Sequence, residues 1–206
     1  MGFLRDHGDI RPSLEHLVTR DRHFKKMFTM DDVDVIPHSH RTISYESFAR
    51  TIVGQQLSVK AAATIWSRVE ALAKPFKPEA LEAIDDATLR AAGLSGQKVV
   101  YLRGLSQAVI DKSFVPAKLK KLSDAEVIDA ITALKGFGRW SAEMVLMFAL
   151  VRPDVFSGGD LGLREGLKRV LKLPERPTEK QSVTLAERWA GHRTAASLLL
   201  WQANHK

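Results

Sequence analysis

Asp160 is the residue whose type and position best suit chemistry in this sequence. It follows Gly158 and Gly159 and precedes the helical run LGLREGLKRVL, so its carboxylate is predicted at the N-terminus of a helix. The helix dipole and the nearby backbone amides stabilise a negative charge at such a position. A carboxylate fixed in this way can stabilise a positive charge that develops on a substrate. The alternative is that Gly-Gly-Asp before a helix forms only a capped loop.

A second chemical signal is the turn LKGFG at residues 134–138, which separates an amphipathic helical run from a strongly apolar one. Its two glycines permit positive φ and let another backbone approach closely. If the turn opens a helix, the amides of Gly138, Arg139 and Trp140 have no intrahelical partner and can bind an anion, most naturally a phosphate. The helix that starts there is roughly 18 Å long. The segment after it is long enough to return, so we expect Asp160 beside the start of that helix.

Two glutamines and two tryptophans are further candidates. Gln55 and Gln56 interrupt an apolar pattern between two predicted helices, and a buried amide needs partners for both its oxygen and its nitrogen. They indicate either a polar task or a hydrogen-bond network at a helix end. Trp140 and Trp201 each lie on an apolar helical run, where core packing is the ordinary role. The electron-rich face of an indole also suits a flat or cationic ligand.

Composition limits the classes of protein that fit. The chain has 206 residues, a formal net charge of +7 and no cysteine. The positive charge favours polyanionic partners, either nucleic acid or an anionic membrane surface. The lack of cysteine excludes disulfides, thiolate zinc sites and iron–sulfur clusters, and the scattered histidines do not indicate a metal enzyme. The N-terminus does not resemble a signal peptide, and no apolar run approaches the roughly 20 residues of a membrane span.

The hydrophobic period is helical almost throughout and no convincing alternating strand is present, so the fold is predicted to be all-α. One helix is expected over Ile10–Phe28, followed by a loop over Asp31–Ser39. On a helix over residues 96–111, Lys98 and Arg103 are expected to stay outside the core. The remaining helices are expected over residues 44–53, 58–73, 79–84, 86–92, 124–133, 139–150, 161–171, 178–189 and 193–204.

Several motifs together carry a family resemblance. The motif GFGRW at residues 136–140 is followed by Asp160 twenty residues after its tryptophan, and IVGQQLSVKAA, GLSGQKVVYL and ERWAGHRTAASLLLW complete a pattern over roughly residues 44–202. In order and spacing they resemble the helix-hairpin-helix DNA glycosylases, the HhH-GPD superfamily, and specifically its 3-methyladenine DNA glycosylase II type. The resemblance implies a compact all-α fold of two helical lobes around a central cleft, in which residues 1–206 form one glycosylase unit without an additional N-terminal β-rich domain. The hairpin would span approximately residues 124–150, with a loop to Asp160.

The resemblance also implies a role for each candidate residue. Asp160 would be the catalytic carboxylate, acting on double-stranded DNA that carries a damaged base. The implied base pocket comprises Gln55, Trp140, Met144 and Trp201; the implied gap-filling residues are Gln56 and Leu57; and the implied phosphate-binding residues are Gly136, Gly138, Arg139 and Trp140. No cofactor is required, although a sodium or potassium ion is implied at the backbone carbonyls of Thr132, Leu134 and Gly136. We expect a monomer that does not bind membranes. Its expected location is the cytoplasm, in association with the nucleoid if the source is bacterial.

Departures from the family pattern narrow the expected activity. Relatives that also cleave the strand carry a nucleophilic lysine where this sequence has Trp140. We therefore expect a monofunctional glycosylase that excises 3-methyladenine, 7-methylguanine and related alkylated purines in base excision repair. Met144 occupies a position where some members have tyrosine, so the resemblance does not define which bases the enzyme accepts. Two alternatives remain: a non-catalytic helix-hairpin-helix DNA-binding protein, in which Asp160 is only a cap, and a bifunctional glycosylase/lyase.

Overall fold

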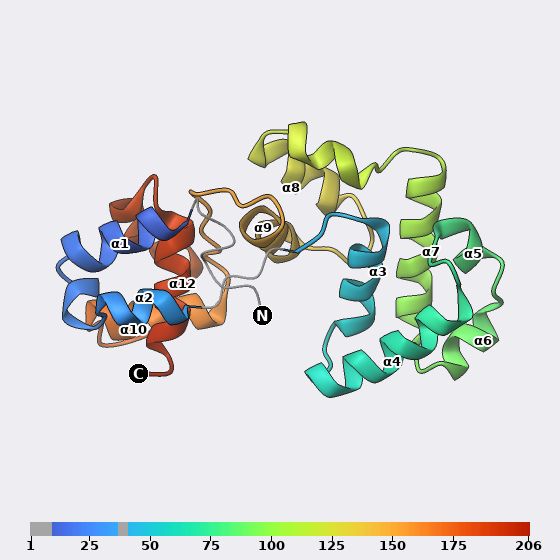
Figure 1. The fold of residues 1–206 in the computed structure, drawn as a ribbon, viewed down its shortest axis with the longest axis horizontal. Helices are drawn as coiled ribbons and strands as arrows, with labels where there is room; N and C mark the ends of the chain where they lie inside the picture. Colours follow the sequence, from blue (N-terminus) through green and yellow to red (C-terminus); the bar gives the residue numbers. More distant parts are fainter. Residues whose placement is uncertain (1–9, 37–40) are drawn as a thin grey trace. The chain divides into compact units, whose positions relative to one another are not determined.

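The computed structural model describes residues 10–36 and 41–206, and every regular element within those ranges is a helix. This confirms the all-α prediction. The chain divides into two compact units (Figure 1): a middle unit of residues 42–142 and a terminal unit of residues 1–41 and 143–206. Within the described ranges, no helix is long and apolar enough to cross a membrane.

Helix α7 (Gly96–Ile110) is the central element of the middle unit, where it packs against α3, α5 and α6. The side chain of Phe48 on α3 meets Phe114 and Phe137 edge-on, with ring centroids 5.1 Å and 5.6 Å apart. The contact with Phe48 anchors Phe137, which belongs to the turn at residues 134–138, to the core of the middle unit. The other elements of this unit are α3 (Tyr45–Gly54), α4 (Val59–Leu72), α5 (Pro78–Glu82), α6 (Asp86–Ala91), η3 (Pro116–Lys121) and α8 (Asp124–Thr132).

The terminal unit is built on the close pairing of α10 (Leu161–Leu171) with α12 (Arg193–Ala203). Gly166 makes this approach possible, because a Cβ atom at that position would lie 2.2 Å from the carbonyl oxygen of Leu200. Leu163 and Leu199 are fully buried in the core beside it. The other elements of this unit are α1 (Arg11–Arg20), η2 (Phe24–Lys26), α2 (Met30–Val35), α11 (Glu179–Ala186) and η4 (Glu187–Trp189).

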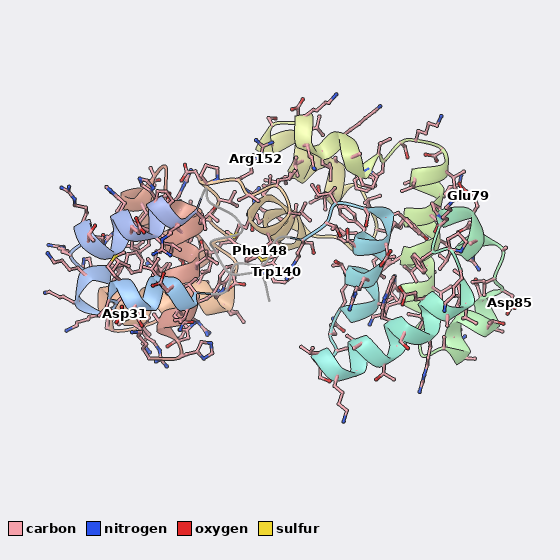
Figure 2. All side chains as sticks on the ribbon, in the orientation of Figure 1. Asp31, Glu79, Asp85, Trp140, Phe148 and Arg152 are labelled. Carbon is pink, nitrogen blue, oxygen red and sulfur yellow. The ribbon has the colours of Figure 1, made fainter. Side chains whose placement is uncertain are left out.

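Helix α9 (Arg139–Phe148) contributes residues to both units, because the boundary between them falls after Ala142. Trp140 stands near its first residue and Phe148 is its last, and both are labelled in Figure 2. Most predicted helices are confirmed to within two residues at each end.

Two predictions near the N-terminus are wrong. The helix expected over Ile10–Phe28 ends at Arg20, because the carboxylate of Asp21 accepts hydrogen bonds from the amides of His23 and Phe24 and starts a new turn. Part of the loop expected over residues 31–39 is helix α2. A Thr29–Asp32 capping box starts α2, with Asp in the place where Glu or Gln is usual. Residues 37–39 of the expected loop lie outside the described residues.

Lys98 and Arg103 lie outside the buried core, as expected, but both are half-buried. Both side chains donate hydrogen bonds to backbone carbonyls at the ends of other helices. Arg103 reaches the carbonyls of Leu81 and Ile84 and forms an ion pair with Asp86. Long cationic side chains can bury their stems while their charged ends find oxygen partners, which periodicity alone does not reveal.

Candidate active site

Asp160 is the N-cap residue of α10, as its position in the sequence predicted. Its Oδ1 accepts a hydrogen bond from the amide of Leu163 at 2.8 Å. The same oxygen accepts a second hydrogen bond, 2.9 Å long, from the indole Nε1 of Trp201 on α12. The carboxylate is therefore fixed by two donors on two helices, at the positive end of the α10 dipole. Asp160 is a cap, and it is also paired with one of the predicted base-pocket residues.

The loop between α9 and Asp160 is anchored on the first turn of α12. The carboxylate of Asp154 accepts hydrogen bonds from Nε and Nη2 of Arg193, both at 2.7 Å. These bonds hold the pKa of Asp154 below its ordinary value. The hydroxyl of Thr194 donates to the carbonyl of Arg152 at 2.6 Å and accepts from the amide of Val155 at 3.0 Å. Helix α12 thus holds the start of the loop and also carries Trp201.

A second anchor lies just before the glycine pair. Ser157 is fully buried and its hydroxyl donates to Oε2 of Glu143 at 2.5 Å. Its carbonyl accepts a hydrogen bond from the amide of Asp160 at 3.0 Å. Gly158 passes so close to α11 that a Cβ atom there would lie 2.6 Å from Val183. The glycine is therefore required for the path of the loop that delivers Asp160.

One side of the Trp201 indole is covered by an aromatic partner. The rings of Trp201 and Phe148 stack with centroids 6.0 Å apart and an angle of 26°. The guanidinium of Arg41 lies 5.3 Å from the centroid of Phe148. The backbone of Gly162 also passes close to the indole, since a Cβ atom there would lie 3.0 Å from Cδ1 of Trp201 and 3.1 Å from Oδ1 of Asp160. These contacts fix the plane of the indole.

A cavity of about 170 Å³ opens beside Trp201 within the terminal unit. Its walls are mainly apolar and aromatic, with two polar side chains, which is the ordinary composition of a small-molecule site. The lining residues are Ile36, Phe148, Leu198, Trp201, Gln202 and His205. Met144, a predicted pocket residue, is buried on α9 one helical turn before Phe148. Phe148 is not among the residues predicted from the sequence, although its spacing of four from Met144 places both on one face of the helix.

The hairpin turn lies in the middle unit, and its two glycines differ. Gly136 has φ +92°, and a Cβ atom there would lie 2.4 Å from the ring of Tyr101 on α7. Gly138 has no atom within 4 Å of a Cβ position, and its carbonyl accepts the hydrogen bond from the amide of Ala142 in the first turn of α9. Gly136 is therefore required by the fold, whereas the space beside Gly138 would admit a side chain.

The two glutamines have separate tasks in the middle unit. The side-chain amide of Gln55 donates to the carbonyl of Gly136 at 2.7 Å, so it links the end of α3 to the hairpin turn. Gln56 is exposed and has φ +57°, a conformation that is uncommon for residues other than glycine and often occurs at functional turns. Leu57 is 38% exposed and Val59 is 90% exposed. The turn at residues 55–57 thus presents Gln56 and Leu57 to solvent, and Val59 follows it.

Two further predicted residues lie in the middle unit. Arg139 and Trp140 are exposed at the start of α9 in the middle unit, and 52% of Trp140 is accessible. The pocket roles of Trp140 and Gln55, and the expected approach of Asp160 to the start of α9, stay predictions. Among the described residues, no cluster of three or more acidic or histidine side chains could hold a metal ion.

Comparison with known proteins identifies the class to which this fold and these residues belong. Residues 49–191 match the family described as HhH-GPD superfamily base excision DNA repair protein. The DNA-3-methyladenine glycosylase 1 of Schizosaccharomyces pombe is 35% identical over 165 residues, which are 78% of this chain and 72% of that protein.

Solved structures agree with the sequence comparison. The DNA-3-methyladenine glycosidase of Bacillus halodurans superposes with a TM-score of 0.82 at 34% identity, over 93% of this chain and 88% of that chain. A 3-methyladenine DNA glycosylase of S. pombe in complex with abasic DNA gives 0.75 at 31% identity, over 93% and 95% of the two chains. The chain therefore belongs to the HhH-GPD superfamily of base excision DNA repair proteins, within its 3-methyladenine DNA glycosylase family.

Proposed function

We propose that this protein is a monofunctional DNA glycosylase that excises 3-methyladenine, 7-methylguanine and related alkylated purines from duplex DNA in base excision repair. The observation that carries the proposal is the 2.9 Å hydrogen bond between Asp160 Oδ1 and Trp201 Nε1, in a chain of this family. This bond places a fixed anion beside an electron-rich ring. Excision of a cationic base requires the ring to bind the base and the anion to stabilise the charge that develops on the deoxyribose. Action as a monomer on chromosomal DNA is part of the proposal.

The reaction begins with extrusion of the damaged nucleotide from the duplex. This step costs on the order of a few kcal/mol, and less for a damaged pair. Alkylation at N3 or N7 makes a purine cationic, so the face of Trp201 attracts it by a cation–π interaction. Because Phe148 covers one side of Trp201, the base has the other side available. Gln56 and Leu57 fill the gap that the extruded nucleotide leaves.

Bond cleavage then depends on Asp160. The C1′–N bond of the nucleotide breaks with its electron pair leaving on the base, which neutralises the positive charge of the alkylated ring. Positive charge develops on the sugar, and the carboxylate of Asp160 stabilises it as carboxylates do in glycoside hydrolysis. Water adds to C1′ and loses a proton, which leaves an abasic site in an intact strand. Trp140 offers no amine for a Schiff base, so no lyase step follows.

The hairpin binds a phosphate that flanks the lesion. The amides at the start of α9 provide donors, and Gly138 adds no side chain that would block them. Carbonyl oxygens of Thr132, Leu134 and Gly136 suit a sodium or potassium ion, which would add positive charge beside that phosphate. Leu134 and Gly136 accept hydrogen bonds from Phe137 and Gln55, but each carbonyl has a second lone pair for a cation.

The proposal is tested with duplexes that each carry one defined lesion. We expect release of the free base and an intact strand, which breaks only after alkali is added. Nicking by the protein alone, or a covalent complex trapped by borohydride, would identify a glycosylase/lyase and contradict the monofunctional mechanism. Binding without any base release would identify a non-catalytic DNA-binding protein.

A further inference from the structure

Lys98 is a charged residue that the proposed reaction does not use. Its Nζ donates hydrogen bonds to the carbonyl oxygens of Val53 at 2.7 Å and Gln55 at 2.8 Å. Among the described residues its hydrogen-bond partners are these two carbonyls and no carboxylate, and burial lowers the pKa of its ammonium group. Because the ammonium group donates to backbone carbonyls and not to a carboxylate, its role is to hold the turn to which those carbonyls belong.

Those carbonyls belong to the C-terminal end of α3. The last carbonyls of a helix have no intrahelical partner and carry the negative end of the helix dipole, so an ammonium group stabilises them. The next residue is Gln56 in its left-handed conformation. Lys98 therefore fixes the point from which the turn at residues 55–57, here called the gap turn, leaves the helix.

The gap turn is also joined to the hairpin turn at residues 134–138. Gln55 accepts from Lys98 with its backbone carbonyl and donates to the carbonyl of Gly136 with its side chain, at 2.7 Å. Tyr101 packs against Gly136 from α7, three residues beyond Lys98 and hence on the same face of that helix. One face of α7 thus holds both turns.

We propose that Lys98 is a positioning residue for extrusion of the nucleotide: it fixes the gap turn relative to the hairpin turn. Gln56 and Leu57 then enter the duplex at the nucleotide whose flanking phosphate the hairpin binds. This inference rests on the proposed function, because it assigns the gap turn to the extrusion step. Preorganised turns need no rearrangement when DNA binds, so the geometry that Lys98 maintains favours the extruded state.

The experiment uses the full chain with Lys98→Met, which keeps the length of the side chain and removes its donors, and with Lys98→Arg, which restores charge and donors. Arg103→Met is the matched control, since Arg103 is another α7 cation on backbone carbonyls, those of Leu81 and Ile84. Two quantities are measured: single-turnover base release from a lesion duplex, and fluorescence of 2-aminopurine beside the lesion, which reports unstacking. Thermal midpoints are recorded for every variant.

We expect Lys98→Met to slow base release about tenfold, one order of magnitude for a misplaced positioning group, and to reduce the fluorescence rise, with Lys98→Arg recovering most of both. Arg103→Met should unfold at a lower temperature and yet extrude and excise at wild-type rates. If Lys98→Met does not fold, Gln55→Leu breaks the link to Gly136 alone and should show the same loss of unstacking. Wild-type fluorescence and rates in the folded variants, or equal losses in Lys98→Met and Arg103→Met, would overturn the inference. Failure of the wild-type protein to release any base would instead contradict the proposed function.

Discussion

The first turns of α9 and α10 use the same backbone feature in opposite ways. Both helices begin after a glycine-containing segment, and both have a positive N-terminal dipole end. At α9 the residue before the helix is Gly138, which has no side chain to cap the amides. At α10 that residue is Asp160, whose carboxylate accepts from the Leu163 amide and from Trp201. One helix start has a glycine in the capping position, and the other has an anion there.

This difference separates binding from chemistry. In the proposed function, a DNA phosphate is attracted to the amides at the start of α9 and repelled by the carboxylate at α10. A developing sugar cation has the reverse preference. The proposal thus assigns the backbone of DNA to one helix start and the charge that appears during the reaction to the other.

The largest expected effect comes from Asp160→Asn, which removes the built-in anion of α10 but keeps an oxygen that can accept both hydrogen bonds. We expect single-turnover base release to fall roughly a hundredfold or more, the scale for loss of a preorganised electrostatic group. Binding to lesion DNA should be unchanged or tighter. Equal excision rates for the two proteins would reduce Asp160 to a helix cap.

A smaller effect is expected from Gly136→Ala, which disturbs the turn that leads into α9. The substitution requires a positive φ and places Cβ 2.4 Å from Tyr101, so the turn must shift. We expect roughly tenfold weaker binding to damaged and undamaged duplexes alike, the consequence of losing a sequence-independent phosphate contact. Gly138→Ala should cost less, since its Cβ meets no atom within 4 Å. Titrations at matched salt concentrations compare them, and a loss restricted to lesion DNA would argue against a phosphate role for the turn.

The smallest effect is expected from Asp154→Asn, which changes a carboxylate at the start of a third helix, α12. Its pKa is lowered mainly by the hydrogen bonds from Arg193, so it stabilises the fold above the ordinary carboxyl pKa of about 3.9. That contribution is lost as the pH falls through the lower folded-state pKa. We expect Asp154→Asn to reduce the free energy of unfolding by about 1 kcal/mol at neutral pH, because the pair is partly exposed. The difference from wild type should shrink in acid, and urea unfolding at several pH values measures it; a constant difference would exclude the ion pair as the cause.

Local patterns in the sequence were sufficient for most of the fold. Capping boxes at Ser123 and Thr178, and the glycines around the hairpin, placed their helices correctly because those signals act within one turn. The Thr29–Asp32 box was missed since Asp at its fourth position is a weaker signal. For Asp160, the sequence predicted the helix-start position, which the structure confirms.

The contacts that complete the site could not be predicted in this way. Trp201 donates to Asp160 across 41 positions of sequence, and the side chain of Gln55 reaches Gly136 across 81. Such pairs depend on how helices pack. Neither hydrophobic periodicity nor a capping motif indicates which distant residues come into contact. The contacts of Lys98 could not be predicted for the same reason. The sequence does not show that the C-terminal end of α3 lies within reach of its side chain.

The contact of Gly162 with both Asp160 and Trp201 limits where the proposed base site can be altered. A single added carbon at Gly162 would meet the indole and the carboxylate at about the same distance, 3.0 Å and 3.1 Å. A larger side chain at Gly162 would therefore displace the indole or the carboxylate, so this position of α10 cannot be used to change the range of bases. Phe148, one turn after Met144 on α9, covers one side of the indole. In the proposed function, a smaller residue in place of Phe148 would uncover that side of the indole for bulkier alkyl adducts, while Asp160 keeps its hydrogen bonds.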